Sequence, residues 1–308
     1  MDVITTPAAA PLLANHPAVR DVIPYDKRGR DSGPLGLIRL ARRIRDGEYG
    51  AAYLAQGSWR SGLLAAMGGV TERIGFDGSG GRMWYTTRIR HIRDQHHAER
   101  LWRLAVGDDV SSAPPEAMRP RLYPDDADRA AVDALLRDVP RDGAKLLALA
   151  PGSIWGTKRW PHFPALAARL APLYRLVVIG SPADSPLADE IAARTGRERL
   201  LDATGKLSLL GSAALIARCA ALVTNDSAPL HLASAMGTPT VAIFGPTVPA
   251  FGFGPLAPRR AIAEVAGLAC RPCHAHGPQR CPLGHFNCMQ ELDASRVLDD
   301  VMRVTVPA

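Results

Sequence analysis

A regular alternation of strand-like and helix-like segments between residues 146 and 245 is the feature that most limits the fold of this chain. Short apolar runs at 146–150, 175–180, 200–204, 221–225 and 240–245 are separated by segments whose apolar residues recur at helical spacing. The connections between these segments are short. Strands that alternate with helices in this way join through right-handed crossovers, so the sequence predicts a parallel, doubly wound sheet flanked by helices.

The first 140 residues show the same alternation less regularly. Strand-like runs at 2–6 and 19–26 are followed by an amphipathic segment at 35–46, with apolar residues on one side and arginines on the other. A segment rich in proline and serine at 110–122 is typical of a loop or linker. With 308 residues, 47% of them hydrophobic, the chain is long enough for two cores of ordinary size. We therefore expect an α/β protein of two Rossmann-like domains, residues 1–140 and residues 141–308.

The composition argues against several classes of protein. No apolar run reaches the roughly 18 residues that a membrane-spanning helix requires, and five cysteines do not match a secreted disulfide framework, so we expect a cytoplasmic protein. The net charge of +7 fits an anionic partner such as a nucleotide or an acidic membrane surface, and equally a proteome rich in arginine. Nucleic-acid binding is not expected, because the sequence carries no helix-turn-helix, RNA-recognition or paired C-x-x-C motif.

The loop that follows the strand at 146–150 has the composition of a phosphate-binding loop. Its sequence, APGSIWGTKRWP, offers small residues at Gly152 and Ser153 and then Thr157 and Lys158. Glycine lets the backbone approach a phosphate, the hydroxyl groups can hydrogen-bond to it, and lysine supplies a point charge. A surface loop with solvated cations is the alternative reading on composition alone.

A second candidate loop follows the strand at 221–225, which runs through an Asn-Asp pair directly into a helix. Asp226, Ser227 and His231 can each be explained as features of a short helix, with Ser227 at the N-cap. The strand at 240–245 ends with FGPT, which offers an aromatic ring, bare backbone and a hydroxyl. Because ligands of open parallel sheets bind beyond the carboxyl ends of the strands, we expect these loops to flank one phosphate-bearing ligand.

Taken in order, APGS, KRWP, TGK and NDSAPLHLASAMGTPTVAIFGPT resemble the motifs of the glycosyltransferase family 9 heptosyltransferases. The tail CRPCHAHGPQRCPLGHFNCM resembles the lipopolysaccharide heptosyltransferase II branch, and the first half matches mainly through DVITT, HPAVRDVIPYDKRG and RIRHIRDQHHAER. The resemblance implies a GT-B fold and inverting transfer from an ADP-heptose donor without a catalytic metal. It also implies a lipid A–core acceptor at the inner face of the cytoplasmic membrane.

The resemblance implies roles for individual residues as well. Lys158, with Ser153, would neutralise the charge of the departing ADP, and Asp226 would contact the sugar hydroxyls. The backbone N–H groups of Ser227 and Ala228 would face the phosphates from the start of a helix. Lys158 and Asp226 are thus the expected catalytic pair, and the expected donor-binding residues are Gly152, Ser153, Thr157, Gly180, Lys206, Ser227, Ala228, His231, Phe244, Gly245, Pro246 and Thr247.

The sequence departs from the family pattern at its start. Family members usually begin with a further strand and a Gly-Asp turn whose aspartate is the candidate general base, whereas this sequence begins at what resembles their second strand. No general base is therefore assigned, and we expect the first domain to lack its first strand, through a misplaced start or a deletion. Smaller departures are Ala228-Pro229, where a glycine is common after Asp-Ser, and Leu207, where threonine is common.

A basic segment at 82–103 is the candidate acceptor site. Arg88, Arg90 and Arg93 could bind acceptor phosphates or carboxylates, because arginine forms paired contacts with both. A solvated helix face, with Asp94 and Glu99 as local partners, is the alternative reading.

Four of the five cysteines, Cys270, Cys273, Cys281 and Cys288, are crowded near the end of the chain. The first two form a C-x-x-C pair, but the spacing of the other two is too loose to be diagnostic of a four-ligand zinc site. Thiols are therefore favoured over a structural zinc ion, and no cofactor is expected. Two rivals to heptosyl transfer stay open, namely another GT-B transferase with a different nucleotide sugar and a non-catalytic protein that still binds a nucleotide sugar.

Overall fold

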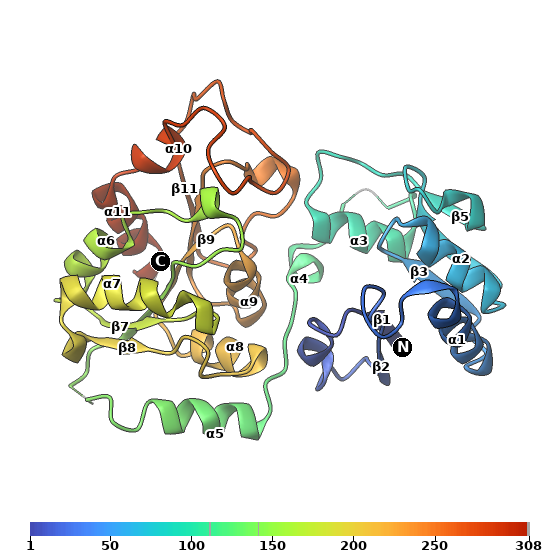
Figure 1. Cartoon of the computed structure of the whole chain (residues 1–308), viewed down its shortest axis with the longest axis horizontal. Coiled ribbons are helices and arrows are strands. Elements are labelled where there is room, and N and C mark those ends of the chain that lie inside the picture. Colours follow the sequence, from blue (N-terminus) through green and yellow to red (C-terminus); the bar gives the residue numbers. More distant parts are fainter. Residues whose placement is uncertain (111, 141, 307–308) are drawn as a thin grey trace. The chain divides into compact units, whose positions relative to one another are not determined.

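The computed structural model describes residues 1–110, 112–140 and 142–306, and their contacts divide the chain into two compact units, Met1–Met118 and Arg119–Ala308. Both units are α/β, and all the strand pairs in them are parallel (Figure 1). Among the helices of the described residues, none combines the length and the apolar character that crossing a membrane requires.

The second unit is built on a six-stranded parallel sheet in the order β11-β10-β9-β6-β7-β8. The sequence predicted five of these strands, and this part of the doubly wound sheet is confirmed. It did not predict the edge strand β11, which follows a loop rich in glycine and proline. The strands are β6 (Leu146–Ala150), β7 (Arg175–Val178), β8 (Leu200–Asp202), β9 (Leu222–Asn225), β10 (Thr240–Phe244) and β11 (Arg260–Glu264).

Helices cover both faces of this sheet, which explains why its strands are almost entirely apolar. The group on one face is α6 (Phe163–Leu170), α7 (Ser185–Thr195) and α11 (Ala294–Thr305), and the group on the other is α5 (Asp126–Leu135), α8 (Leu209–Ala217) and α9 (Ala228–Met236). A short helix, α10 (Asn287–Gln290), precedes α11.

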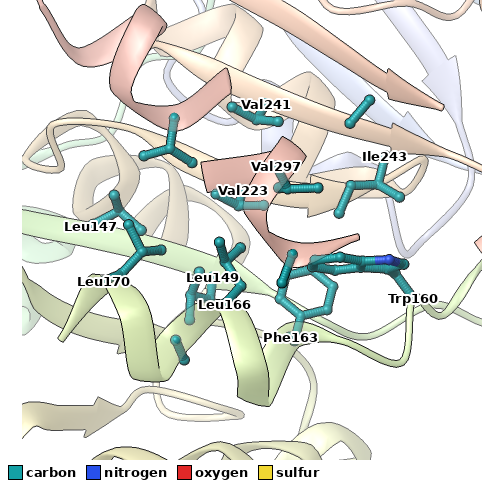
Figure 2. Packing of buried hydrophobic residues seen from close by; sticks show 14 of the residues in the cluster. Leu147, Leu149, Trp160, Phe163, Leu166, Leu170, Val223, Val241, Ile243 and Val297 are labelled. Carbon is teal, nitrogen blue, oxygen red and sulfur yellow. The ribbon is translucent and has the colours of Figure 1, made fainter. Parts of the chain in front are cut away.

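Alternate residues of each strand point to opposite faces of the sheet, so the buried side chains form a separate cluster on each face. Figure 2 shows side chains of β6, β9 and β10 packed against α6 and α11, and all of those labelled are at most 2% exposed. They are Leu147, Leu149, Trp160, Phe163, Leu166, Leu170, Val223, Val241, Ile243 and Val297. Truncating one of these leucines to alanine would cost about 2–5 kcal/mol of stability. The sheet is therefore a rigid base for the loops at its edge.

The first unit has its strands in two separate sheets, β1-β2 and β3-β4-β5. This arrangement is the one that a doubly wound sheet has when its first strand is missing, because that strand would pair with the next strand on one side and with the fourth on the other. The strands are β1 (Asp2–Thr5), β2 (Asp21–Pro24), β3 (Ala51–Leu54), β4 (Glu72–Phe76) and β5 (Thr87–Ile89).

Helices α1 and α2 link the two sheets of the first unit. The helices of this unit are α1 (Gly33–Asp46), α2 (Trp59–Met67), α3 (His97–Val106) and α4 (Pro115–Met118). Ile23 of β2 shares a buried cluster with Leu40 of α1 and Leu64 of α2, against which Ala52 of β3 also packs. The amphipathic pattern at 35–46 therefore marks a helix whose apolar side faces this cluster.

The division between the units comes earlier in the chain than the boundary expected at residue 140. Helix α5, which that boundary assigned to the first domain, packs against α8 of the second unit. Ser208 at the start of α8 donates a hydrogen bond to Asp128 over 2.7 Å, and Arg218 forms an ion pair with Asp133. These contacts explain why residues 119–140 group with the second unit.

Candidate functional site

The strand order of the second unit reverses between β6 and β9. Strands β6, β7 and β8 follow one another outward on one side, and β9, β10 and β11 do so on the other. Loops that leave the carboxyl ends of strands at such a reversal turn away from each other and leave a crevice, which is the usual ligand site of an open parallel sheet. The two loops that the sequence singled out leave β6 and β9, the two strands beside this point.

Lys158 and Asp226 meet where these two loops leave the sheet. Lys158 ends a 3-10 turn, Gly156–Lys158, in the loop after β6, and its Nζ lies 2.5 Å from Oδ2 of Asp226, which directly follows β9. Thr247, beyond the end of β10, donates its hydroxyl hydrogen to the same carboxylate oxygen over 2.7 Å. The Lys158 and Asp226 side chains are only 12% and 11% exposed. The expected convergence of the loops is therefore present, and an anion arriving here would meet a lysine that is already held in place.

Asn225, which the sequence analysis did not assign to the site, holds the two strand ends together. Its side chain is fully buried and accepts a hydrogen bond from the backbone N–H of Trp160 over 3.2 Å. Its amide nitrogen donates to the carbonyl oxygen of Pro151 over 2.8 Å. Both partners belong to the loop after β6, so Asn225 fixes that loop against β9. The sequence signal that could have indicated this role is an asparagine that ends an apolar strand, just before the candidate aspartate.

Helix α9 begins directly at the site, with Ser227 at its N-cap position. The Ser227 hydroxyl lies 3.4 Å from the carbonyl oxygen of Asn225 and makes no side-chain capping bond to the helix. The first N–H groups of a helix have no partner within it, and the positive end of the helix dipole lies there. The start of α9, at Ser227 and Ala228, therefore adds an anion-attracting element beside Lys158.

The small residues expected around a diphosphate lie close to a carboxylate. A Cβ atom at Gly152 would come within 2.3 Å of an Asp184 side-chain oxygen, and one at Gly180 would come within 2.8 Å. The Asp184 carboxylate caps the backbone N–H of Ser181 over 2.8 Å. Ser153 accepts a hydrogen bond from the Trp155 backbone through its hydroxyl. Asp184 lies so close to both positions that a residue with a Cβ atom would collide with it, so both must be glycine.

Three residues expected at the donor make contacts within the protein instead. Thr157 is 3% exposed and donates its hydroxyl hydrogen to the carbonyl oxygen of Pro278 over 2.5 Å. Phe244, expected among the donor-binding residues, is 1% exposed, and its ring packs against Leu230 in the core. Lys206 donates to the carbonyl oxygen of Asp202 over 2.7 Å.

The remaining residues of the expected donor set lie around the end of β10 and on α9. A Cβ atom at Gly245 would come within 2.6 Å of the Met289 side chain, and the carbonyl oxygen of Pro246 accepts a hydrogen bond from the backbone of Cys273. His231 is exposed on α9, and its ring meets that of Phe253 edge to face, with the centroids 6.5 Å apart.

All five cysteines are free thiols. Burial raises the pKa of the Cys288 thiol to about 11 and that of Cys219 to about 12, so neither is readily ionised. Within residues 1–110, 112–140 and 142–306, no group of three or more His, Cys, Asp and Glu side chains has an arrangement that could hold a metal ion.

The three arginines expected at an acceptor lie in the first unit. Arg88 belongs to β5, and Arg90 and Arg93 follow it, all with exposed side chains. The backbone N–H of Arg90 donates to the Asp108 carboxylate over 3.0 Å, which fixes the turn after β5. The structure therefore leaves these guanidinium groups accessible to an anionic acceptor.

Residues 37–281 match the sequence profile of glycosyltransferase family 9, described as the heptosyltransferase family. The chain belongs to glycosyltransferase family 9. Its sequence is 29% identical to lipopolysaccharide heptosyltransferase 2 of Salmonella typhimurium over 265 residues, or 82% of this chain and 75% of that protein. It is also 29% identical to lipooligosaccharide heptosyltransferase 2 of Haemophilus influenzae over 271 residues, or 82% of this chain and 76% of that protein.

Solved structures of heptosyltransferases show the same fold. The structure of the Escherichia coli ADP-heptose lipopolysaccharide heptosyltransferase II matches with a TM-score of 0.75 at 24% identity, covering 99% of this chain and 88% of that one. An E. coli heptosyltransferase solved with ADP matches with a TM-score of 0.70 at 20% identity, covering 98% of this chain and 89% of that one. The fold is accordingly the GT-B fold, and this glycosyltransferase has the two Rossmann-like units expected of it.

Proposed function

We propose that this family 9 glycosyltransferase moves heptose from ADP-heptose to the inner core of lipopolysaccharide, with inversion at the anomeric carbon. The similarity to heptosyltransferases acting on lipopolysaccharide and lipooligosaccharide supports this proposal. The observation that carries it is the contact of Lys158 with Asp226 at the reversal of the strand order. A cation, a carboxylate and a helix N-terminus meet there, which suits a ligand with both a diphosphate and sugar hydroxyls.

In the proposed reaction an acceptor hydroxyl oxygen attacks the anomeric carbon from the face opposite ADP. The bond between that carbon and the phosphate oxygen breaks, and ADP leaves with the electron pair. Lys158 and the N–H groups at the start of α9 stabilise the charge that builds up on the diphosphate. Asp226 accepts hydrogen bonds from the sugar hydroxyls. A general base takes the acceptor proton, and no residue is assigned to that role.

Charge stabilisation by Lys158 takes the part that a metal ion has in other transferases, so we propose transfer without a metal. Full activity after treatment with EDTA is the expected result, and loss of activity that Mg²⁺ or Mn²⁺ restores would contradict it. Metal analysis of the same protein tests the alternative of a structural zinc ion at Cys270, Cys273, Cys281 and Cys288. One zinc per chain would establish that alternative.

For the acceptor side, we propose that the exposed Arg88, Arg90 and Arg93 bind phosphates or carboxylates of a lipid A–core acceptor. Arginine suits these groups because its planar fork pairs with two oxygens at once. The enzyme would then work in the cytoplasm, peripherally at the inner face of the cytoplasmic membrane. Loss of sedimentation with acceptor-containing vesicles after replacement of all three arginines would support this assignment.

Titration with sugar donors separates the proposed function from its two rivals. Purified protein is given ADP-heptose, a GDP-sugar or a UDP-sugar, each with a lipid A–core acceptor, and the sugar product and nucleotide are measured. Transfer from ADP-heptose alone is the expected result. Transfer from another donor would favour a different GT-B transferase, and donor binding without turnover would favour a non-catalytic binding protein.

A further inference from the structure

One segment of the cysteine-rich tail, residues 271–279, contacts both loops of the candidate donor site. We call it the bracing segment. At its start, Arg271 has a side chain only 7% exposed, although it carries a full charge. Its guanidinium donates to the carbonyl oxygens of Gly245 over 2.5 Å and Thr247 over 3.1 Å, both in the loop after β10. It also donates to Val265 and to the Glu264 carboxylate, at the end of β11.

The other end of the bracing segment holds the loop after β6. The Gln279 side chain accepts a hydrogen bond from the backbone N–H of Gly156 over 3.0 Å and donates one to the carbonyl oxygen of Ile154 over 3.0 Å. The carbonyl oxygen of Pro278 accepts from both the backbone N–H and the hydroxyl of Thr157. Four hydrogen bonds therefore fix the turn that ends at Lys158.

Between these ends the segment lies directly against Lys158. A Cβ atom added at Gly277 would come within 3.2 Å of Lys158 Cγ, and one added at Gly156 would come within 2.4 Å of the Gln279 carbonyl oxygen. Gly277 has a φ of +83°, a conformation that other residues rarely adopt. The Trp155 ring stacks on that of His276, with the centroids 6.4 Å apart and the planes 12° from parallel. Two backbones approach closely here, and glycine makes that approach possible.

The Arg271 contacts also set the orientation of the loop after β10. A peptide unit is planar, so a hydrogen bond to its carbonyl oxygen also fixes the orientation of the unit. Arg271 binds the carbonyl oxygens of Gly245 and Thr247, and so fixes the peptide unit before Pro246 and the one after Thr247. The Thr247 hydroxyl is then held where it donates to Asp226. A buried charge requires such partners, because leaving it unpaired is costly.

We propose that Arg271 and Gln279 are positioning residues of the transferase, which hold the loops after β10 and β6 so that Thr247, Asp226 and Lys158 meet at the donor. This inference rests on the proposed function for the identity of the donor, but the bracing itself does not. Neither residue is expected to contact the reacting atoms. Each acts through a loop whose own residues face the donor.

Gln279 offers the cleaner test, because its side chain is exposed and its removal should not prevent folding. Gln279→Ala removes both contacts to the turn, and Gln279→Glu keeps an acceptor for the Gly156 N–H while losing the donor to Ile154. Gln290→Ala, which removes another exposed glutamine, is the matched control. Hydrogen exchange of the backbone amides at 154–158 should become about five-fold faster or more in Gln279→Ala. It should stay close to wild type at Gly156 in Gln279→Glu and in the control.

Kinetics and ADP binding then show whether the bracing matters for transfer. Gln279→Ala should lower kcat by about ten-fold or more while its KM for ADP-heptose changes less, because Lys158 acts on charge that appears in the transition state. ADP affinity, measured by calorimetry, should fall by a smaller factor. Unchanged exchange at 154–158, or unchanged kcat despite faster exchange, would overturn the assignment of Gln279.

Arg271 is buried, so its test needs a control that shares this burial. Arg175 of β7 also has a buried guanidinium, which contacts Glu198 and Asp142 away from the site. Both Arg271→Lys and Arg175→Lys should lower the melting temperature. Only Arg271→Lys should speed amide exchange at 245–248 and lower kcat about ten-fold. Equal effects of the two variants on kcat would mean that Arg271 contributes only to stability, and would overturn its assignment as a positioning residue.

These measurements distinguish a failure of the bracing from a failure of the proposed function. Wild-type protein that bound no ADP would count against the proposed function, whereas the exchange comparison at 154–158 would still show whether the bracing segment holds the loop. Wild-type protein that bound ADP, beside variants with wild-type exchange and turnover, would leave the proposed function standing and refute the bracing.

Discussion

Lys158 Nζ lies 2.5 Å from Asp226 Oδ2, although 68 positions separate the two residues in the sequence. The pair joins the loops after β6 and β9, and both side chains are largely shielded from water. In the proposed reaction, a diphosphate bound here would compete with Asp226 for the ammonium group of Lys158. The ion pair would then keep the cation partnered in the free enzyme, which avoids the cost of a lone charge in a sheltered position.

Replacing Lys158 should affect turnover more than donor binding. Lys158→Ala is expected to lower kcat by about 100- to 1,000-fold, the usual cost of removing one group that stabilises transition-state charge. ADP affinity should fall by no more than about ten-fold, because the start of α9 remains. Lys145→Ala, which removes an exposed lysine just before β6, is the control. An unchanged kcat would rule out the leaving-group role of Lys158.

Replacing Asp226 should instead alter the choice of sugar. Asp226→Asn keeps the size of the side chain but weakens its hydrogen bonds with sugar hydroxyls, so discrimination between ADP-heptose and ADP-hexoses should decrease by about ten-fold or more. ADP itself should bind within about three-fold of wild type, because it carries no heptose. The ratio of kcat/KM for the two donors measures this effect, and full retention of wild-type discrimination would count against a sugar contact.

Asn225 should matter for stability as well as for the site. Asn225→Ala removes two hydrogen bonds and leaves the Trp160 N–H and Pro151 carbonyl without these partners. We expect a loss of about 2–4 kcal/mol in the free energy of unfolding, measured with urea. Asn15→Ala, at an exposed position, should change it by less than about 0.5 kcal/mol. A loss as small as that of the control would show that the loop after β6 is held by other contacts.

Asp300 of α11 provides a prediction about pH. Burial raises the pKa of its carboxyl group above the ordinary value of 3.8, with Arg303 opposing the shift. The folded protein therefore holds this proton more tightly than the unfolded chain, so the contribution of Asp300 to stability improves as the pH falls through the raised pKa. Asp300→Asn should be more stable than wild type at pH 7, and the advantage should shrink as the pH falls through the raised pKa toward 3.8. Thermal melts at several pH values test this.

Asp299→Asn, at the exposed neighbouring position, controls for the change in net charge. An advantage of Asp300→Asn that did not depend on pH would mean that titration of this carboxyl is not its cause.

The architecture of the second unit could be predicted from the sequence because its strands are buried on both faces and its connections are short. The meeting of Lys158 with Asp226 followed from the same reasoning, since parallel strands end at one edge of a sheet. The first unit was harder to predict, because its strands are only partly buried.

The contacts of two expected site residues could not be read from the sequence, for physical reasons. Phe244 is the last residue of β10, and it continues the inward alternation of Ala242 instead of turning toward a ligand. Thr157 lies in a loop with a typical phosphate-binding composition, but its hydroxyl is taken by Pro278, 121 residues away. The roles of Arg271 and Gln279 could not be predicted either, because no periodicity relates an irregular segment to loops so far from it in sequence.

The place of residues 271–279 in the chain also fixes the order in which the donor site is completed during synthesis. A nascent polypeptide that has left the ribosome as far as β11 already carries Lys158, Asp226 and Thr247, yet none of the contacts of Arg271 or Gln279. Nucleotide binding by such an intermediate would be weak, because its loops lack their downstream support. Full affinity for the donor would arise only late in translation, when the tail has folded back across the loop after β6, which was made more than a hundred codons earlier.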